Sequence, residues 1–188
     1  MPKKPKGAYA APTTLKAFGK KKKDDSVLQV IVETPKGSRN KYKFEPKLGM
    51  FVLGKVLPDG MVFPYDFGFV SSTVAEDGDP LDVLLLMDEP AFPGCLIESH
   101  VIGVIEGVET ENGKKERNDR IVAVAGQSHT HSNLKDIKDL NQTLLDEVCQ
   151  FFVNYHQEKG VKFKVIATRG RRHAMRLVKE AIQNKKAA

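Results

Sequence analysis

From residue 27 onward, the chain alternates between short apolar runs and turn-forming residues, which is the pattern of β-strands. Each run is about the length of one strand, and Pro and Gly separate the runs repeatedly. Strands are predicted at 27–32, 41–45, 50–53, 81–87, 96–108, 121–125 and 161–167. The run at 81–87 is apolar at nearly every position, as in a strand buried on both faces. Asn112-Gly113 predicts a hairpin turn that leads to the strand at 121–125.

Two segments late in the chain have the spacing of amphipathic helices. The first places apolar residues on one helix face, at Leu144, Leu145, Val148, Phe151, Phe152 and Tyr155. Gly160 predicts where this helix stops. The second repeats the spacing at Ala174, Leu177, Val178, Ala181 and Ile182. Many short strands with two late helices predict a mainly β fold with α-helices (α+β), built as a closed or nearly closed β-barrel with flanking helices.

Charge is distributed unevenly, so the net charge of +6 and the pI of 9.2 describe only a sum. Residues 1–23 hold eight lysines and no acid, and residues 162–188 hold nine basic residues and one acid. Residues 24–161 carry a net charge of −10. An acidic body between two basic ends argues against a nucleic-acid-binding function for the whole protein, and it favours carboxylates gathered around cations.

The same composition predicts the domain organisation. Residues 1–25 are rich in Lys, Pro, Ala and Gly, and a flexible basic tail is expected there. Residues 26–188 are long enough for a single barrel domain that ends in a basic C-terminal helix. The alternative for both basic ends is binding to a polyanion such as nucleic acid, although the tails are poor in aromatic residues for base stacking.

Several classes of protein are excluded by the residues that the sequence lacks. No apolar run approaches the ~18 residues of a transmembrane helix, and no apolar segment follows the first lysines as in a secretory signal. A cytoplasmic protein without a membrane partner is therefore expected. The two cysteines, Cys95 and Cys149, are too few for a disulfide scaffold or a four-thiolate zinc site. The two histidines of 128–132 have no third ligand nearby, so a polar loop is expected there.

Three aspartates, Asp77, Asp79 and Asp82, fall within six residues immediately before an apolar strand. In an extended chain Asp77 and Asp79 would point to one side and Asp82 to the other, unless the residues between them turn the backbone. Like charges at this spacing repel one another unless cations bind between them, and hard oxygen ligands suit Mg²⁺ or Mn²⁺. The positions of Leu81 and Asp82 do not fit an EF-hand loop. An acidic turn that caps a strand is the structural alternative.

The stretch Asp77-Gly78-Asp79-Pro80-Leu81-Asp82-Val83-Leu84 resembles the signature of the soluble family I inorganic pyrophosphatases, in a divergent bacterial type. The resemblance runs from about residue 27 to residue 164 and includes further matching segments at 30–35, 41–42, 63–69, 101–104, 121–124, 129, 137–139 and 151–155. The two basic ends lie outside it or match it poorly.

This resemblance implies an OB-like five-stranded barrel with two flanking helices, often assembled as a hexamer in bacteria. It also implies Mg²⁺-dependent hydrolysis of pyrophosphate to two phosphates, with Mn²⁺ or Co²⁺ as other possible cofactors. Asp79 would be the general base and Glu33 would support the water and metal network. The implied metal ligands are Asp77, Asp82, Asp119 and Glu109. The implied phosphate-binding residues are Lys41, Lys55, Arg120 and Tyr155.

The chain also departs from the family pattern at seven positions of the implied site. Lys43 replaces a carboxylate, Lys55 an arginine and Phe67 a tyrosine. Glu109 and Asn118 align with metal-binding aspartates, with Asp119 next to the second position. Arg120 and His156 both replace lysines.

Two interpretations of these departures follow. In the first, Asp119 and Glu109 take over the metal roles, Lys43 substitutes for the charge of one metal ion, and the protein is a working pyrophosphatase. In the second, the barrel is a non-catalytic phosphate- or nucleic-acid-binding module or hydrolyses another phosphoanhydride. The three retained aspartates favour the first interpretation, because a carboxylate cluster is costly without a cation.

Overall fold

Strands dominate the computed structural model, which describes residues 27–71 and 73–187, with side chains through residue 185. The predicted basic tail therefore lies outside the described residues. The strands are β1 (Val27–Thr34), β2 (Asn40–Glu45), β3 (Met50–Val56), β4 (Asp66–Val70), β5 (Asp82–Leu86), β6 (Leu96–Glu111), β7 (Lys114–Arg117), β8 (Arg120–Ala125) and β9 (Lys162–Gly170). The helices are α1 (Gln142–Gln157) and α2 (Arg171–Ala187), with a 3₁₀ turn, η2, at Ile137–Asp139.

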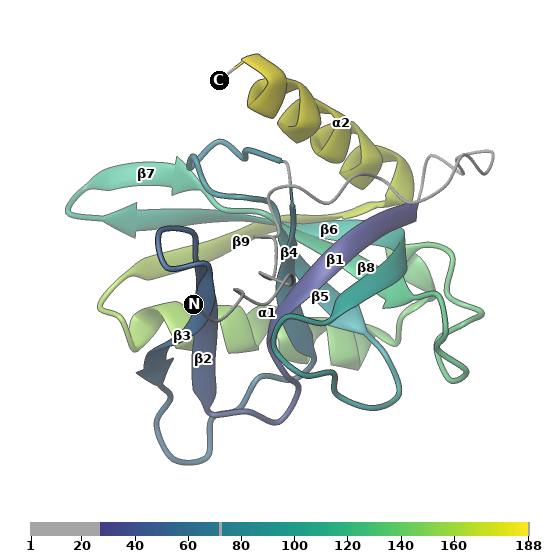
Figure 1. The fold of residues 1–188 in the computed structure, drawn as a ribbon, viewed down its shortest axis with the longest axis horizontal. Helices are drawn as coiled ribbons and strands as arrows, with labels where there is room; N and C mark the ends of the chain where they lie inside the picture. Colours follow the sequence, from purple (N-terminus) through teal and green to yellow (C-terminus); the bar gives the residue numbers. More distant parts are fainter. Residues whose placement is uncertain (1–26, 72, 188) are drawn as a thin grey trace, which may run out of the picture.

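Five strands form a closed barrel (Figure 1). The order β1-β4-β5-β8-β6 closes because β6 also pairs with β1, from Val27 opposite His100 to Ile31 opposite Leu96. Strands β7 and β9 extend the sheet along the long strand β6, and β2 and β3 form a separate hairpin. The predicted α+β barrel of five strands with two helices is confirmed.

The structure corrects the prediction in detail at two strands. The turn at Asn112 (φ 49°) and Gly113 (φ 79°) leads first to β7, a strand that was not predicted because it is entirely polar or charged. Strand β4 was not predicted either, since it is short and contains Gly68. This glycine is required, because a Cβ there would lie 2.1 Å from the carbonyl oxygen of Ile31 in β1.

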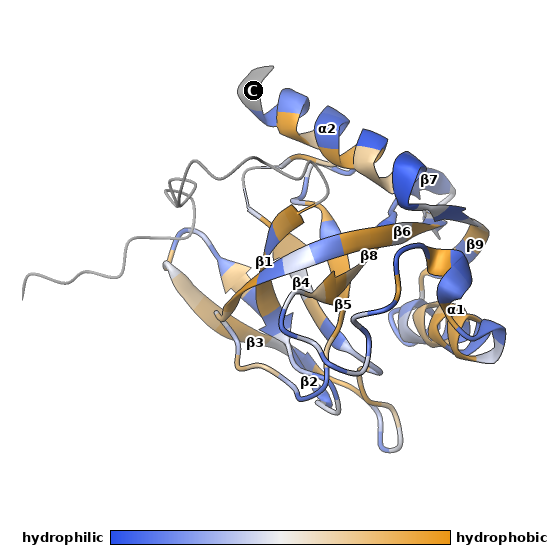
Figure 2. Cartoon of the chain, turned by 90° about the vertical axis from the view of Figure 1, so that its right-hand side faces the viewer, coloured by the Kyte–Doolittle hydropathy of each residue, from blue (hydrophilic) through white to orange (hydrophobic). Residues whose placement is uncertain are grey.

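Alternate residues of the barrel strands face two separate cores. On one side Leu84 and Leu86 of β5 pack with α1, and on the other Val83 and Leu85 pack with α2. The two helices lie on opposite sides of the barrel in Figure 1, and Figure 2 shows α2 turning its apolar stripe toward the strands. Because both faces of β5 are buried, its sequence is a run of apolar residues, as predicted. No helix among the described residues is long and apolar enough to cross a membrane.

Candidate active site

Strands β5 and β8 place an acid and a base side by side. The two strands run parallel, and their first residues, Asp82 and Arg120, are paired in register. Arg120 Nε lies 3.6 Å from Asp82 Oδ2, and the guanidinium is buried, with 3% of the side chain exposed. It lies between the rings of Phe152 and Phe163, 5.2 and 5.3 Å from their centres. These contacts hold a permanent positive charge at the edge of the barrel where β5 begins.

The other two aspartates, Asp77 and Asp79, lie on a tight turn, so the backbone between Asp77 and Asp82 does turn, the alternative to an extended chain. Gly78 has a φ of 87°, in the left-handed region that favours glycine. The Asp79 backbone N–H donates to Asp77 Oδ1 at 3.1 Å, and Ala75 N donates to the carbonyl of Asp79 at 2.8 Å. The turn therefore directs Asp77 toward Asp82, while Asp79 stands exposed at its tip.

A cavity of about 300 Å³ lies between this turn and α2. Its lining includes Asp77, Asp82 and Asp119, together with Leu177, Glu180 and Ala181 of α2. Helix α2 also holds the segment before the turn, because Val74 N donates to the carbonyl of Ala181 at 3.0 Å. The late helix thus forms one wall of the cavity that contains three of the four predicted metal ligands.

The pKa of Asp82 is raised to about 6: burial is the largest cause, the nearby charges of Glu33 and Asp77 also raise it, and Arg120 and Lys41 oppose the shift. Burial also raises the pKa of Asp77. These shifts indicate two carboxylates that lack sufficient positive charge around them. We call Asp77, Asp79 and Asp82 the carboxylate pole.

Glu33 holds Lys41 in place beside the barrel. Glu33 is almost fully buried on β1; its Oε1 accepts from Phe44 N at 2.7 Å and its Oε2 accepts from Lys41 Nζ at 3.1 Å. The Lys41 ammonium also lies 4.3 Å from the ring centre of Phe67. Phe67 lacks the hydroxyl of the usual tyrosine, but its ring still provides a face for this cation.

Tyr155 on α1 lies beside two lysines. The Lys55 ammonium is 4.3 Å and the Lys159 ammonium 4.7 Å from the centre of its ring. Burial raises the pKa of Tyr155 to about 12, so its hydroxyl remains a hydrogen-bond donor. Burial lowers the pKa of Lys159, the charge of Glu109 opposes this shift, and the positive charges of Lys55, Arg120 and Lys41 add to it. We call Lys41, Lys55, Arg120, Tyr155 and Lys159 the phosphate pole.

Lys159 was missed by the sequence analysis. It lies just beyond the last turn of α1, outside the segments that carry the family resemblance by motif. The sequence offered one indication of Lys159. Position 156 holds histidine where the family pattern has lysine, so a nearby residue would have to supply that positive charge.

Glu109 on β6 contacts protein donors. His156 Nε2 lies 2.6 Å from Glu109 Oε1, Arg120 Nη2 lies 3.8 Å from the same oxygen, and Asn118 Nδ2 also donates to it. Arg120 Nη1 donates to the side-chain and main-chain oxygens of Asn118. The hydrogen bond from His156 is the main cause that lowers the pKa of Glu109 to about 2. We call Glu109, Asn118, Arg120 and His156 the Glu109 cluster.

His156 is fully buried, and its ring stacks on Phe163 with 4.4 Å between ring centres. Phe163 can lie there because residue 107 is glycine; a Cβ at Gly107 would meet the ring at 2.1 Å. The other ring nitrogen of His156, Nδ1, lies 2.7 Å from the carbonyl oxygen of Phe152. Burial lowers the pKa of His156 and the bond to Glu109 raises it. With an acceptor at each ring nitrogen, one proton is held between His156 and Glu109.

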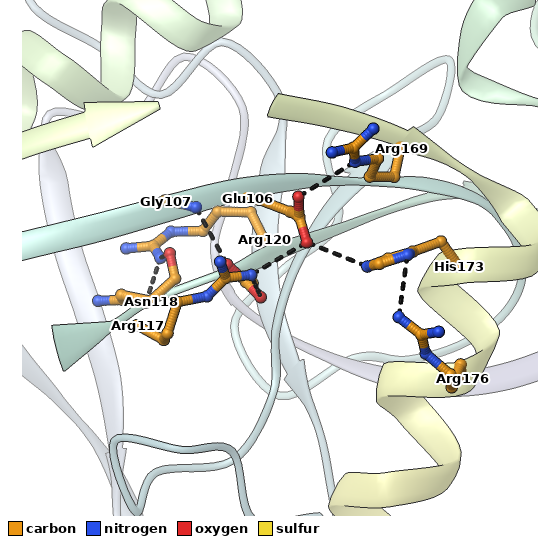
Figure 3. A network of polar contacts seen from close by, with 9 residues as sticks. Glu106, Gly107, Arg117, Asn118, Arg120, Arg169, His173 and Arg176 are labelled. Carbon is orange, nitrogen blue, oxygen red and sulfur yellow. Dashed lines mark hydrogen bonds and ion pairs between the residues drawn. The ribbon is translucent and has the colours of Figure 1, made fainter. Parts of the chain in front are cut away.

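Asp119 is part of a second polar network, and its partners Gly107 and Arg117 are labelled in Figure 3. Its Oδ1 accepts from Gly107 N at 3.0 Å and its Oδ2 accepts from Arg117 at 2.8 Å. Arg117 also donates to the buried Glu106 at 3.0 Å. Arg169 and His173 contact Glu106 as well, at 3.3 and 3.0 Å. Asp119 is thus tied through Arg117 to cations of β9 and α2.

The structure brings the predicted site residues together around the edge of the barrel where β5 and β8 begin. Lys43, in contrast, is exposed on β2. Within residues 27–71 and 73–187, no three side chains of His, Cys, Asp or Glu already form a ligand set for one metal ion. The loop at 128–132 is organised by Asp88, which accepts from Ser128 Oγ and from His129 N at 2.8 Å each.

Comparison with known proteins identifies the family. The chain matches the family described as inorganic pyrophosphatase over residues 30–186. The inorganic pyrophosphatase of Synechocystis is 34% identical over 85% of this chain and 92% of its own length. The crystal structure of the inorganic pyrophosphatase from Thermus thermophilus superimposes with a TM-score of 0.84 at 32% identity, over 94% of this chain and 99% of that one. That from Neisseria gonorrhoeae gives a TM-score of 0.78 at 33% identity, over 87% and 93%.

The chain therefore belongs to the inorganic pyrophosphatase family. The expected assignment as a diphosphatase, a hydrolase of phosphoanhydride bonds, is confirmed at the level of the family. Membership also implies a divalent metal cofactor.

Proposed function

We propose that this chain hydrolyses inorganic pyrophosphate to two phosphates in a reaction that depends on Mg²⁺. The observation that carries the proposal is the cavity of about 300 Å³ lined by Asp77 and Asp82. Mg²⁺ usually binds proteins through one or two carboxylates and completes its shell with water and substrate phosphate oxygens. Two aspartates that line the cavity, Asp77 at its exposed edge and Asp82 partly buried, have raised pKa values and supply the oxygen donors and the unneutralised charge that such an ion requires.

In this proposal Asp77 and Asp82 hold Mg²⁺, which, when bound, neutralises phosphate charge and makes the attacking water more acidic. Asp79 accepts a proton from the water while the water oxygen attacks one phosphorus atom in line with the bridging oxygen. The exposed position of Asp79 at the tip of the turn lets its carboxylate face a substrate held outside the barrel. Glu33 positions Lys41 through their 3.1 Å contact.

The phosphate pole binds the leaving group. As the bridging bond breaks, its electron pair passes to the oxygen of the departing phosphate, and Lys41, Lys55 and Arg120 stabilise the added negative charge. Tyr155 donates a hydrogen bond, since its pKa of about 12 keeps the hydroxyl protonated. These roles require a cationic pole beside an anionic one, and the registered pair of Asp82 and Arg120 provides that junction.

Phosphate release from pyrophosphate by the purified protein tests the proposal. With Mg²⁺ we expect catalysis, and Asp79→Asn should reduce kcat by about 10²–10⁴-fold, as for loss of a general base. Circular dichroism shows whether the variant is folded. No release above that of the variant with Mg²⁺, Mn²⁺ or Co²⁺ would contradict the catalytic proposal.

A panel of pyrophosphate, tripolyphosphate and nucleoside triphosphates distinguishes the proposed substrate from other phosphoanhydrides. We propose pyrophosphate as the preferred substrate of a cytoplasmic homo-oligomer, with a hexamer as the expected assembly. Sedimentation equilibrium measures the mass of that assembly. Faster hydrolysis of tripolyphosphate at equal concentration would assign the site to another phosphoanhydride.

A non-catalytic polyanion-binding module is the second candidate, and the exposed basic residues Arg172, Arg176 and Lys185 of α2 favour it. This candidate predicts salt-sensitive binding to RNA or DNA that weakens when residues 1–23 or 169–188 are removed. Unchanged weak binding after both truncations would exclude it.

A further inference from the structure

Glu109 and Asp119 have more protein donors than the carboxylate pole, where Asp77 accepts from the Asp79 N–H and Asp82 has an ion pair with Arg120. Three side chains reach the single oxygen Oε1 of Glu109, and both oxygens of Asp119 accept hydrogen bonds. Asp82, in contrast, has one ion pair, at 3.6 Å, and its pKa is raised. Carboxylates of the same site therefore have different environments: those of Glu109 and Asp119 are well supplied with hydrogen-bond donors, and that of Asp82 is not.

The charges of the Glu109 cluster leave no net attraction for a cation. One proton lies between Glu109 and His156, so this pair is neutral in sum wherever the proton resides. Asn118 adds no charge, and Arg120 adds one positive charge. A divalent ion on the remaining oxygen of Glu109 would stand beside Arg120 and the protonated pair, at a cost that burial increases.

Asp119 is neutralised in the same way. Arg117 bonds it at 2.8 Å and is itself anchored to Glu106 at 3.0 Å (Figure 3). Displacing Arg117 from Asp119 would leave a half-buried guanidinium with one carboxylate partner fewer. Asp119 would also have to give up the hydrogen bond from Gly107.

We propose that Glu109 and Asp119 do not ligate metal, and that protein cations supply the positive charge on this side of the site. Glu109 instead anchors Arg120, a buried cation that adds its positive charge to that of Lys41, Lys55 and Lys159. Metal ions are confined to the carboxylate pole. The inference rests on the proposed function, because it assumes that Asp77 and Asp82 bind the divalent ion.

Counting bound Mn²⁺ by electron paramagnetic resonance tests the inference, with Mn²⁺ alone and with methylenebisphosphonate as a non-hydrolysable pyrophosphate analogue. Glu109→Gln and Asp119→Asn should bind as many ions per chain as the unaltered protein, and Asp82→Asn should bind at least one fewer. Glu116→Gln, an exposed carboxylate on β7, is the matched control. Loss of one ion in Glu109→Gln or Asp119→Asn would overturn the inference.

Two further outcomes keep the two proposals separate. An unchanged count in Asp82→Asn would remove the metal role of the carboxylate pole, which is a failure of the proposed function. His156→Asn removes the imidazole and leaves Glu109, so it should gain one ion if it folds, as monitored by circular dichroism. A count in the folded His156→Asn variant equal to that of the unaltered protein would overturn the inference that His156 and Arg120 keep a cation away.

Discussion

The carboxylate pole and the Glu109 cluster lie around the same residue, Arg120, yet the pKa of a carboxylate is raised in one and lowered in the other. At the pole, burial without enough donors raises the pKa of Asp82 to about 6. In the cluster, a histidine at 2.6 Å lowers the pKa of Glu109 to about 2. A carboxylate whose charge is already balanced within the fold gains little from a metal ion, whereas one that lacks nearby positive charge gains from binding a cation or a proton. The comparison thus assigns different roles to acids that look equivalent in the sequence.

The largest expected difference is in catalysis. Asp82→Asn should lower kcat/KM by on the order of 10³-fold, since it removes charge that the reaction requires at the metal. Glu109→Gln should lower it by no more than about tenfold, because an amide oxygen still accepts from His156. Steady-state phosphate release measures both. Equal losses of kcat/KM in the two variants would show that the carboxylate pole and the Glu109 cluster do not differ in their role in catalysis.

Stability separates the two regions next. Arg120→Met should reduce the free energy of unfolding by about 3–5 kcal/mol, because it leaves the partly buried carboxylates of Asp82 and Glu109 without their cation. Arg120→Lys is the matched control, which keeps the charge and should lose less. Urea denaturation followed by circular dichroism gives both values. A loss below 1 kcal/mol in the methionine variant would show that the guanidinium is not needed to balance Asp82 and Glu109.

Substrate affinity tests the lysine that sequence analysis missed. Lys159→Met should raise KM for pyrophosphate about tenfold, the effect of losing one charge-assisted contact, with a smaller change in kcat. Lys162→Met, at an exposed position on β9, is the matched control. An unchanged KM in Lys159→Met would place this lysine outside the phosphate pole.

The pH dependence of stability should have opposite signs for the two acids. In chelator, raising the pH from about 4 to about 6 should lower the free energy of unfolding through Asp82, because the folded state binds its proton more tightly than the unfolded state. Glu109 stabilises the fold above its unfolded pKa of about 4.3, and this contribution is lost as the pH falls through about 2. Urea denaturation at several pH values measures both slopes.

Asp82→Asn should remove the upper slope and Glu109→Gln the lower one. The same upper slope in Asp82→Asn as in the unaltered protein would assign it to another group.

Local sequence pattern was sufficient to predict much of the fold. The apolar run of β5, the spacing on α1 and the Asn112-Gly113 turn each carry their own signal, because burial on a face or a positive φ demands particular residue types. Strand β7 carries no such signal, since its polar residues pair along β6 without entering a core.

The site was predicted as a set of residues but not as a network. The three aspartates are adjacent in sequence, so their cluster was visible. The contact between Glu109 and His156 joins β6 to the end of α1, and nothing in either segment alone specifies it. Likewise, the sequence alone suggests that Asp119 can bind a metal ion. In the structure both of its carboxylate oxygens accept hydrogen bonds, from Gly107 and Arg117.

The parallel pairing of β5 with β8 has a consequence for folding kinetics. Parallel strands cannot be joined by a hairpin, and the connection between Asp82 and Arg120 contains the long strand β6, so their pairing is long-range in the sequence. Such long-range pairing forms late, because loop closure must precede it. A ligand that binds only the completed edge stabilises the native state more than the transition state. Mg²⁺ is therefore expected to slow unfolding while leaving the refolding rate unchanged, which stopped-flow measurements with and without the ion can show.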